Sequence, residues 1–202
     1  MKLPIEIISC ILSFLPQASL ATTSCVTRVF NHESEFYLYR NVCIKHAYQL
    51  RVFLQATAGS HRRRLLLRSL HSSVPIPFVA LLDGGFRNLT YLSCLPCTRS
   101  ASHIAVLAPT ARPGPEVLKL KHLECNPDVD EHFISFLKSQ PTITKLDIVS
   151  ESISCVPSAD VLPALEVLSC SKRDLSLFVN GRPIKKARLF LFLRQISNRT
   201  LI

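Results

Sequence analysis

The chain has 202 residues with a formal net charge of +10, and 48% of its residues are hydrophobic against 19% that are charged. Such a composition buries one sizeable core or two small ones, which argues against a disordered chain. The positive charge by itself favours an anionic partner such as nucleic acid. The basic residues are scattered, however, apart from the run His61–Arg64, and no nucleic-acid-binding motif accompanies them. We therefore hold nucleic-acid binding as the weaker alternative and interpret the basic run as a solvated turn.

The first 21 residues, MKLPIEIISCILSFLPQASLA, are open to two interpretations. An apolar run followed by small residues is typical of a secretory signal peptide, which would make the chain a secreted repeat protein. Pro4, Glu6 and Pro16 interrupt the run, so it is too short to span a membrane, and we expect no transmembrane segment. Pro4 and Glu6 instead suit the first turn of a helix, because a missing N–H costs nothing there and an acidic side chain complements the helix dipole.

We predict that this helix spans residues 5–14 and has two apolar stripes. One stripe packs on the protein's own core, and the other needs a second surface, such as a partner chain. The first stripe contains Ile5, Ile8, Leu12 and Leu15, and the second contains Ile7, Ile11 and Phe14. Apolar residues continue at helical spacing at Val26, Val29, Phe30 and Tyr37. Since that second stretch needs the first helix to pack against, we expect the N-terminus to be retained.

Three stretches of the opening segment follow one known pattern: LPIEIISCILSFLP, SLATTSCVTRVFN and LYRNVCI. In this order they resemble the F-box motif over residues 3–44, with Thr27 where Ser or Cys is usual. The closing Leu38-Tyr39-Arg40, followed by a short β-like piece, is similar to fungal F-box proteins in particular. The resemblance implies that these helices dock on a Skp-type adaptor and through it on a cullin. The adaptor contacts that it implies are Leu3, Pro4, Ile7, Leu12, Leu20 and Val26.

A repeat follows beyond a linking helix, HAYQLRVFLQATAG, that we expect to end at Gly59. Paired apolar residues recur in six segments, at Leu67 and Leu70, Leu89 and Leu92, Leu120 and Leu123, Ile143 and Leu146, Leu165 and Leu168, and Ile184 and Ala187. Their intervals centre on the roughly 20 to 29 residues of a leucine-rich repeat, in which each unit adds one strand to a parallel sheet. We predict parallel strands, stacked in sequence order, near residues 67–71, 90–94, 121–125, 144–148, 166–170 and 185–189.

The resemblance to leucine-rich repeats is looser than the F-box resemblance. Three units place a cysteine two positions after the second apolar residue, at a site that points into the core: Cys94, Cys125 and Cys170. Only Cys97 meets the Asn/Cys position that closes each turn, so the array is irregular, and an ordinary α/β domain with parallel strands stays open. We predict a helix on the convex side within DVDEHFISFLKSQP and an insertion loop at TRSASHIAVLAPTARPGP.

The predicted fold class is α/β, with N-terminal F-box helices followed by an irregular leucine-rich-repeat-like solenoid with a parallel sheet. We expect the F-box over residues 1–45, a linking helix and basic turn over 46–64, and the repeat-like region over 65–202, whose completeness at the C-terminus stays open. No zinc site is expected, because Cys94 and Cys97 lack a second pair of ligands at comparable spacing. No cofactor is expected either.

These resemblances imply a substrate-recognition subunit of an SCF-type cullin-RING E3 ubiquitin ligase, in the cytoplasm or nucleus, whose repeats bind a target protein of unknown identity. The sequence has no nucleophile elbow, phosphate-binding loop or zinc-protease motif, so we expect no enzyme activity. The alternatives are a non-enzymatic protein- or nucleic-acid-binding solenoid and a secreted repeat protein. The positive charge favours an acidic or phosphorylated target. Target contacts are expected on the concave face of the sheet, at Tyr91, Lys121, His122, Lys145, Asp147, Lys186 and Arg188.

Overall fold

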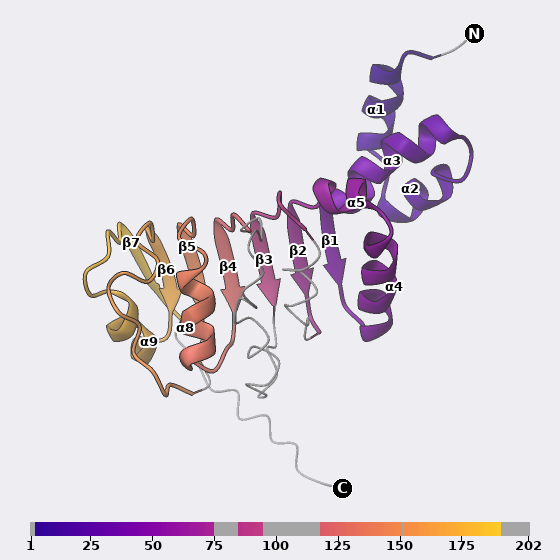
Figure 1. The fold of residues 1–202 in the computed structure, drawn as a ribbon. Coiled ribbons are helices and arrows are strands. Elements are labelled where there is room, and N and C mark those ends of the chain that lie inside the picture. Colours follow the sequence, from indigo (N-terminus) through magenta and orange to yellow (C-terminus); the bar gives the residue numbers. More distant parts are fainter. Residues whose placement is uncertain (1–2, 75–84, 95–117, 151, 191–202) are drawn as a thin grey trace, which may run out of the picture.

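The computed structural model describes residues 3–74, 85–94, 118–150 and 152–190. Helices make up the N-terminal part, and a sheet of parallel strands with helices beside it makes up the rest (Figure 1). The fold is therefore mixed α/β, with N-terminal helices and a parallel sheet. The expected insertion loop and Cys97 lie outside the described residues. None of the described helices is long and apolar enough to cross a membrane.

Three helices form the N-terminal part: α1 (Ile5–Ser13), α2 (Gln17–Thr23) and α3 (Arg28–Arg40). The helix predicted over residues 5–14 is thereby confirmed. Thr27 is the N-cap of α3, because its side-chain oxygen accepts the backbone N–H of Phe30 at 3.2 Å. The three helices share a small apolar core of buried Ile8, Leu12 and Leu20, with Leu15, Phe30, Tyr37 and Leu38 packed around it.

Seven described strands lie side by side in sequence order and form one parallel sheet. They are β1 (Asn41–Ile44), β2 (Ser69–Ser72), β3 (Tyr91–Cys94), β4 (His122–Cys125), β5 (Lys145–Ile148), β6 (Val167–Cys170) and β7 (Lys186–Leu189). The six predicted strands are confirmed in position, direction and order. β1 lies at the short β-like piece expected after Leu38-Tyr39-Arg40. It follows α3 without a loop and pairs with β2. The sheet therefore begins at the very end of the N-terminal helices.

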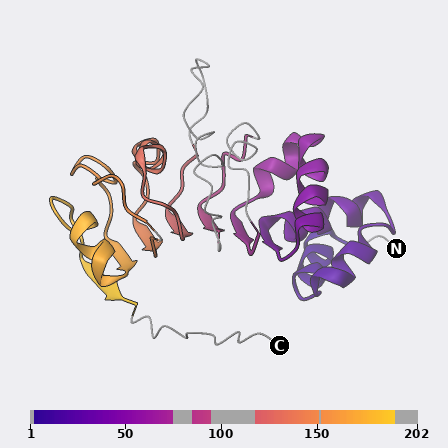
Figure 2. The same cartoon turned by 90° about the horizontal axis from the view of Figure 1, so that it is seen from below.

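Four further described helices connect the strands: α4 (Ala47–Ala58), α5 (His61–Leu66), α8 (Glu131–Lys138) and α9 (Lys172–Phe178). α4 confirms the linking helix that ends at Gly59, and α8 confirms the helix after β4. α8 begins after Asp130, whose carboxylate accepts the backbone N–H of Phe133 at 2.8 Å. Figure 2 shows α4 and α8 on the same side of the curved sheet.

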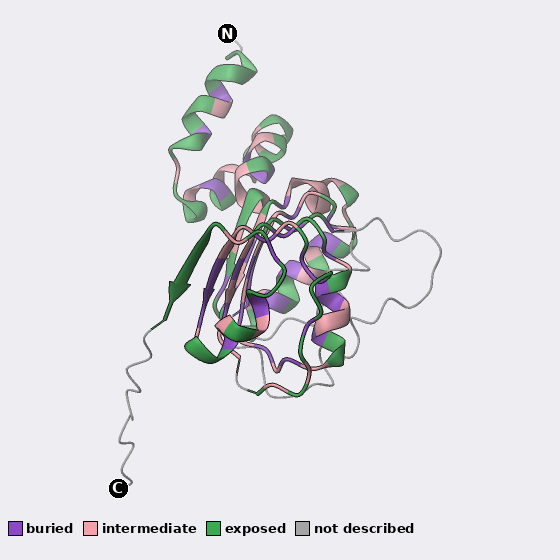
Figure 3. Cartoon of the chain, turned by 90° about the vertical axis from the view of Figure 1, so that its left-hand side faces the viewer, coloured by how far each residue is buried: buried purple, intermediate pink, exposed green. Residues whose placement is uncertain are grey.

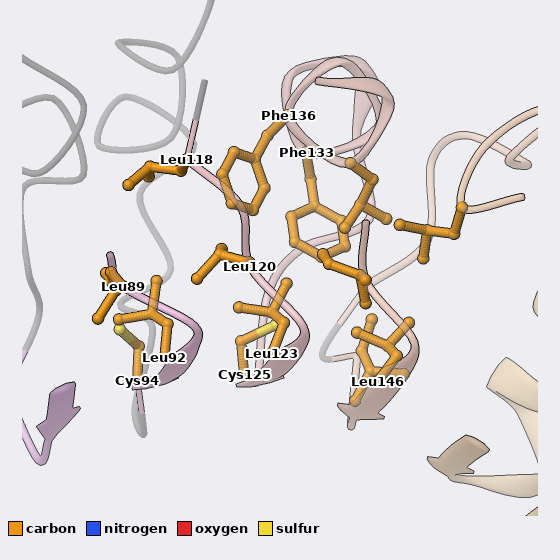
Figure 4. Packing of buried hydrophobic residues seen from close by; sticks show 14 of the residues in the cluster. Leu89, Leu92, Cys94, Leu118, Leu120, Leu123, Cys125, Phe133, Phe136 and Leu146 are labelled. Carbon is orange, nitrogen blue, oxygen red and sulfur yellow. The ribbon is translucent and has the colours of Figure 1, made fainter. Parts of the chain in front are cut away.

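The core lies between the sheet and these helices. Successive side chains of a strand point to opposite faces, so the second and fourth residue of each strand share the helix-covered face. In β2 to β6 the second residue is a fully buried leucine: Leu70, Leu92, Leu123, Leu146 and Leu168. Phe133 and Phe136 of α8 point toward Leu120 and Leu123 (Figure 4). The predicted interior position of the cysteines is confirmed, since all three are at most 2% exposed: Cys94, Cys125 and Cys170.

The basic run His61–Arg64 was interpreted as a solvated turn, and this interpretation is wrong. The run lies in α5, where Arg62 and Arg63 pair with Glu35 of α3. The Nε of Arg63 donates to Oε1 of Glu35 at 2.8 Å, and Nη1 of Arg62 donates to Oε2 at 3.2 Å. The sequence pattern did not reveal this contact because Glu35 lies 27 and 28 residues away from the two arginines.

We call Glu35, Arg62 and Arg63 the Glu35 clasp. Nη1 of Arg63 also donates to the carbonyl of Ala56 in α4 at 3.1 Å, so the clasp joins α3 to both α4 and α5. The hydrogen bond to Glu35 raises the pKa of Arg63 above its ordinary value, against the opposing effect of burial. Together with the direct passage from α3 into β1, the clasp sets the N-terminal helices against the start of the sheet.

Candidate functional site

The two predicted stripes of α1 face different surroundings. Ile8 and Leu12 of the first stripe are buried in the core of the three helices. The second stripe points outward: Ile7 is 48% exposed, Ile11 is 50% exposed and Phe14 is 81% exposed. Their spacing of four and three residues places them on one face of the helix. We call these three residues the apolar stripe of α1.

Other exposed apolar side chains lie near this stripe in the sequence. They are Leu3 and Ile5 at the start of α1, and Val26 and Val29 around the start of α3. Isolated exposed apolar residues are normal on a protein surface, but a run of them along one short helix marks an interaction site. The N-terminal helices therefore carry a surface suited to an apolar partner.

The structure separates the six expected adaptor contacts into two groups. Leu3, Pro4, Ile7 and Val26 are exposed. The expectation for Leu12 and Leu20 needs correction, because these side chains are 0% and 3% exposed and hold the helices together. Four further exposed apolar residues were not among the expected adaptor contacts: Ile5, Ile11, Phe14 and Val29. Helical periodicity contained the signal for Ile11 and Phe14, since both belong to the outward stripe.

The second candidate surface is the face of the sheet opposite the helices, which we call the open face. It carries the first and third residues of each strand, and no described helix covers it (Figure 3). Six of the seven expected target contacts lie on it: Tyr91, His122, Lys145, Asp147, Lys186 and Arg188. The seventh, Lys121, is exposed and directly precedes β4.

Aromatic rings connect β2, β3 and β4 across the open face. The rings of His71 and Tyr91 stack with their centroids 6.4 Å apart, and the ring of His122 meets Tyr91 edge-on at 4.6 Å. The hydroxyl of Tyr91 donates to Oε2 of Glu124 at 2.8 Å. Burial, followed by this hydrogen bond, raises the pKa of Tyr91 to about 12. The tyrosine therefore stays protonated and keeps Glu124 hydrogen-bonded at neutral pH.

Asp147 connects the aromatic rings to the charged side of the face. Its Oδ2 lies 2.8 Å from Nε2 of His122 and 2.9 Å from Nζ of Lys145. Burial acts to raise the pKa of Asp147, but hydrogen bonds from Ser169, Lys145 and His122 outweigh it and lower the pKa. Asp147 therefore carries a negative charge at neutral pH that offsets the charge of Lys145. The centre of the open face is polar but not strongly basic.

The cations at the far end of the sheet are placed differently. Lys185 pairs with Glu166 at 2.6 Å, whereas Lys186 and Arg188 have no acidic partner within the described part of the chain. Both side chains are exposed on β7. The basic character of the open face is therefore concentrated at this strand.

No group of three or more His, Cys, Asp or Glu side chains that could hold a metal ion occurs among the described residues. The buried cysteines at the fourth strand position instead line the core, where a thiol packs as a small apolar group. Burial raises the pKa of Cys170 to about 11, so this thiol is not a thiolate at neutral pH.

Comparison with known proteins identifies the N-terminal helices. A family model described as the F-box domain matches residues 1–32, which include α1, α2 and the start of α3. A search of curated proteins found no match to the chain. The sheet lies outside the matched residues. The chain thus carries an F-box domain at its N-terminus, and this domain implies binding to a Skp-type adaptor.

Proposed function

We propose that this chain is the non-catalytic substrate-recognition subunit of an SCF-type cullin-RING ubiquitin ligase. Its N-terminal helices bind a Skp-type adaptor and through it a cullin, and its sheet holds a target protein for ubiquitin transfer by other subunits. The F-box match over residues 1–32 carries the proposal. Such a subunit needs no cofactor and acts in the cytoplasm or nucleus, leading its target to ubiquitin-dependent degradation.

The apolar stripe of α1 supports the adaptor-binding role. Protein interfaces of ordinary size bury about 1,600 Å² and depend on a few large apolar anchors. Ile7, Ile11 and Phe14 are such side chains, and none of them is needed for the core of the three helices. We propose Leu3, Pro4 and Val26 as additional contacts because they are exposed beside the same helices.

The order of the strands supports a repeat architecture for the sheet. We propose an irregular leucine-rich-repeat-like solenoid of fungal F-box type, in three parts over residues 1–45, 46–64 and 65–202. In doubly wound α/β domains the strand order reverses at a switch point, whereas stacked repeats add strands in sequence order. The described sheet runs from β1 to β7 without a reversal. The division proposed at residue 45 falls directly after β1.

Target binding is proposed on the open face, through the six residues placed there and Lys121. Lys186 and Arg188, which have no acidic partner among the described residues, favour an acidic or phosphorylated protein. Nucleic acid is the second candidate, and the net charge of +10 favours it. Glu124 and Asp147 lie in the middle of the open face, however, and dilute the uniform positive field that a polyanionic duplex requires.

Adaptor binding provides the test of the proposed function. The full chain is co-expressed with a Skp-type adaptor, and the amount of adaptor that co-purifies is measured. Ile11→Glu places a charge in the apolar stripe and should reduce binding at least tenfold. Val52→Glu is the matched control, because Val52 is 56% exposed on α4, outside the stripe, against 50% for Ile11. Equal adaptor binding by both variants would contradict the proposal.

A further inference from the structure

β7 forms the end of the sheet opposite β1, and the described residues place no strand on its outer edge. All four residues of β7 are exposed, whereas Leu168 and Cys170, which pair with two of them from β6, are fully buried. Figure 3 shows this exposed strand, coloured green, at the rim of the sheet. Among the described residues, β7 is thus the last strand of the sheet, and its side chains are exposed.

The backbone of β7 directs hydrogen-bonding groups to this outer edge. Lys186 donates its N–H to the carbonyl of Glu166 at 3.1 Å, and Phe190 donates to that of Cys170 at 2.9 Å, both toward β6. In a strand, the N–H and C=O groups of successive residues point to opposite sides. The groups of the alternate residue Ala187 therefore point away from β6, as do those of Leu189.

The side chains of β7 alternate in chemistry. Lys186 and Arg188 lie on the open face, with no acidic partner within the described residues. Ala187 and Leu189 lie on the opposite face, where the side chain of Leu189 is 49% exposed. A strand added at this edge would meet two cations on one face and apolar surface on the other.

From this arrangement we propose that the edge of β7 binds an extended segment of a partner protein, as an additional strand in which acidic and apolar residues alternate. The backbone of the segment pairs with Ala187 and Leu189, and its carboxylates meet Lys186 and Arg188. Strand addition of this kind takes affinity from main-chain hydrogen bonds and specificity from alternate side chains. The inference deepens the proposed target-binding role and rests on it.

The positive charge of β7 favours an acidic segment of another protein over two other candidates for this edge, a second copy of the chain and residues 191–202. A second copy of the chain would set Lys186 and Arg188 against the same two cations, and like charges opposite each other destabilise strand pairs. Residues 191–202 of this chain include Arg194 and Arg199 and no acidic residue. An acidic segment of another protein is the occupant that neutralises the edge.

The test uses the full chain and a labelled synthetic peptide of alternating Glu and Val, with a peptide of alternating Lys and Val as the charge-reversed control. Ala187→Pro removes the outward N–H and spares the hydrogen bonds to β6, because an edge strand tolerates proline where its N–H faces outward. Ala187→Val keeps that N–H and is the matched control. We expect fluorescence anisotropy to show equal binding of the acidic peptide by wild type and Ala187→Val. Binding by Ala187→Pro should be at least about fivefold weaker.

A double variant tests the role of charge. Lys186→Glu combined with Arg188→Glu should bind the acidic peptide at least about tenfold more weakly than wild type. Circular dichroism of each variant verifies that the fold is retained. The inference is overturned by wild-type affinity in Ala187→Pro or by equal binding of the two peptides. A dimer in sedimentation velocity that Ala187→Pro dissociates also overturns it, because a second copy would then occupy the edge.

Adaptor co-purification on the same proteins separates this inference from the proposed function. Peptide binding without adaptor binding would leave the strand-addition site in place and refute the ligase role. Adaptor binding without peptide binding would refute the strand-addition site alone.

Discussion

Replacing Arg63 by methionine should destabilise the protein more than replacing Glu35, its partner in the Glu35 clasp, by glutamine. The side chain of Glu35 is only 10% exposed, whereas those of Arg62 and Arg63 are 38% and 32% exposed. Arg63→Met leaves a buried carboxylate with a single cation, and an uncompensated buried charge costs about 3 to 5 kcal/mol. Because Arg62 remains 3.2 Å from the carboxylate, we expect a loss near the lower end, about 3 kcal/mol.

Glu35→Gln should cost less than Arg63→Met. Water reaches both arginines once the carboxylate is gone, and partly exposed ion pairs contribute about 1 kcal/mol or less each. We therefore expect a loss of about 1 to 2 kcal/mol. The double variant, Glu35→Gln with Arg63→Met, should be more stable than Arg63→Met alone, because it no longer buries an unpaired carboxylate.

Urea denaturation followed by circular dichroism measures these free energies of unfolding. Arg51→Met, at an exposed position of α4, is the matched control and should change the free energy of unfolding by less than about 0.5 kcal/mol. If the double variant loses as much stability as the two single variants added together, the reasoning is refuted. Arg63 would then act independently of Glu35.

Three further predictions concern other parts of the chain. Within the described part of the chain, the acceptors of buried Arg182 are all backbone carbonyls, so Arg182→Met should lower the free energy of unfolding by about 2 to 4 kcal/mol in urea denaturation. Recovery of full stability by Arg182→Lys would contradict the need for a planar guanidinium at this position. The pKa of Tyr91, about 12 in the folded chain, exceeds the ordinary tyrosine value near 10, so its contribution to stability is full below about pH 10 and is lost as the pH rises toward 12. Glu124→Gln should lower this pKa, which phenolate absorbance measures, and an unchanged titration would exclude a role for the carboxylate. Leu3→Ala with Pro4→Ala should weaken adaptor co-purification about tenfold while leaving the sheet folded, and unchanged adaptor binding would contradict these two proposed contacts.

Local patterns in the sequence were sufficient for the main elements of the fold. Two apolar stripes predicted α1. Paired apolar residues, at intervals centred on the length of a leucine-rich repeat, predicted the six strands from β2 to β7 in their observed order. The cysteines of the fourth strand position were likewise predicted to be buried. These features depend on residues a few positions apart, because side-chain periodicity follows directly from the geometry of a helix or strand.

Contacts between distant residues were decided only by the tertiary structure. The sequence could not show that Arg62 and Arg63 meet Glu35, or that Asp147 offsets the charge of Lys145. Nor could it show that Lys186 and Arg188 of β7 lack an acidic partner within the described part of the chain. It also could not show which residues of α1 and α2 belong to the core and which face outward. Leu12 and Leu20 were expected as adaptor contacts, and the structure buries both in the core of the three helices. The physical reason is the same in each case. A charge or an apolar side chain has many possible partners along the chain, and the packing of the elements selects among them.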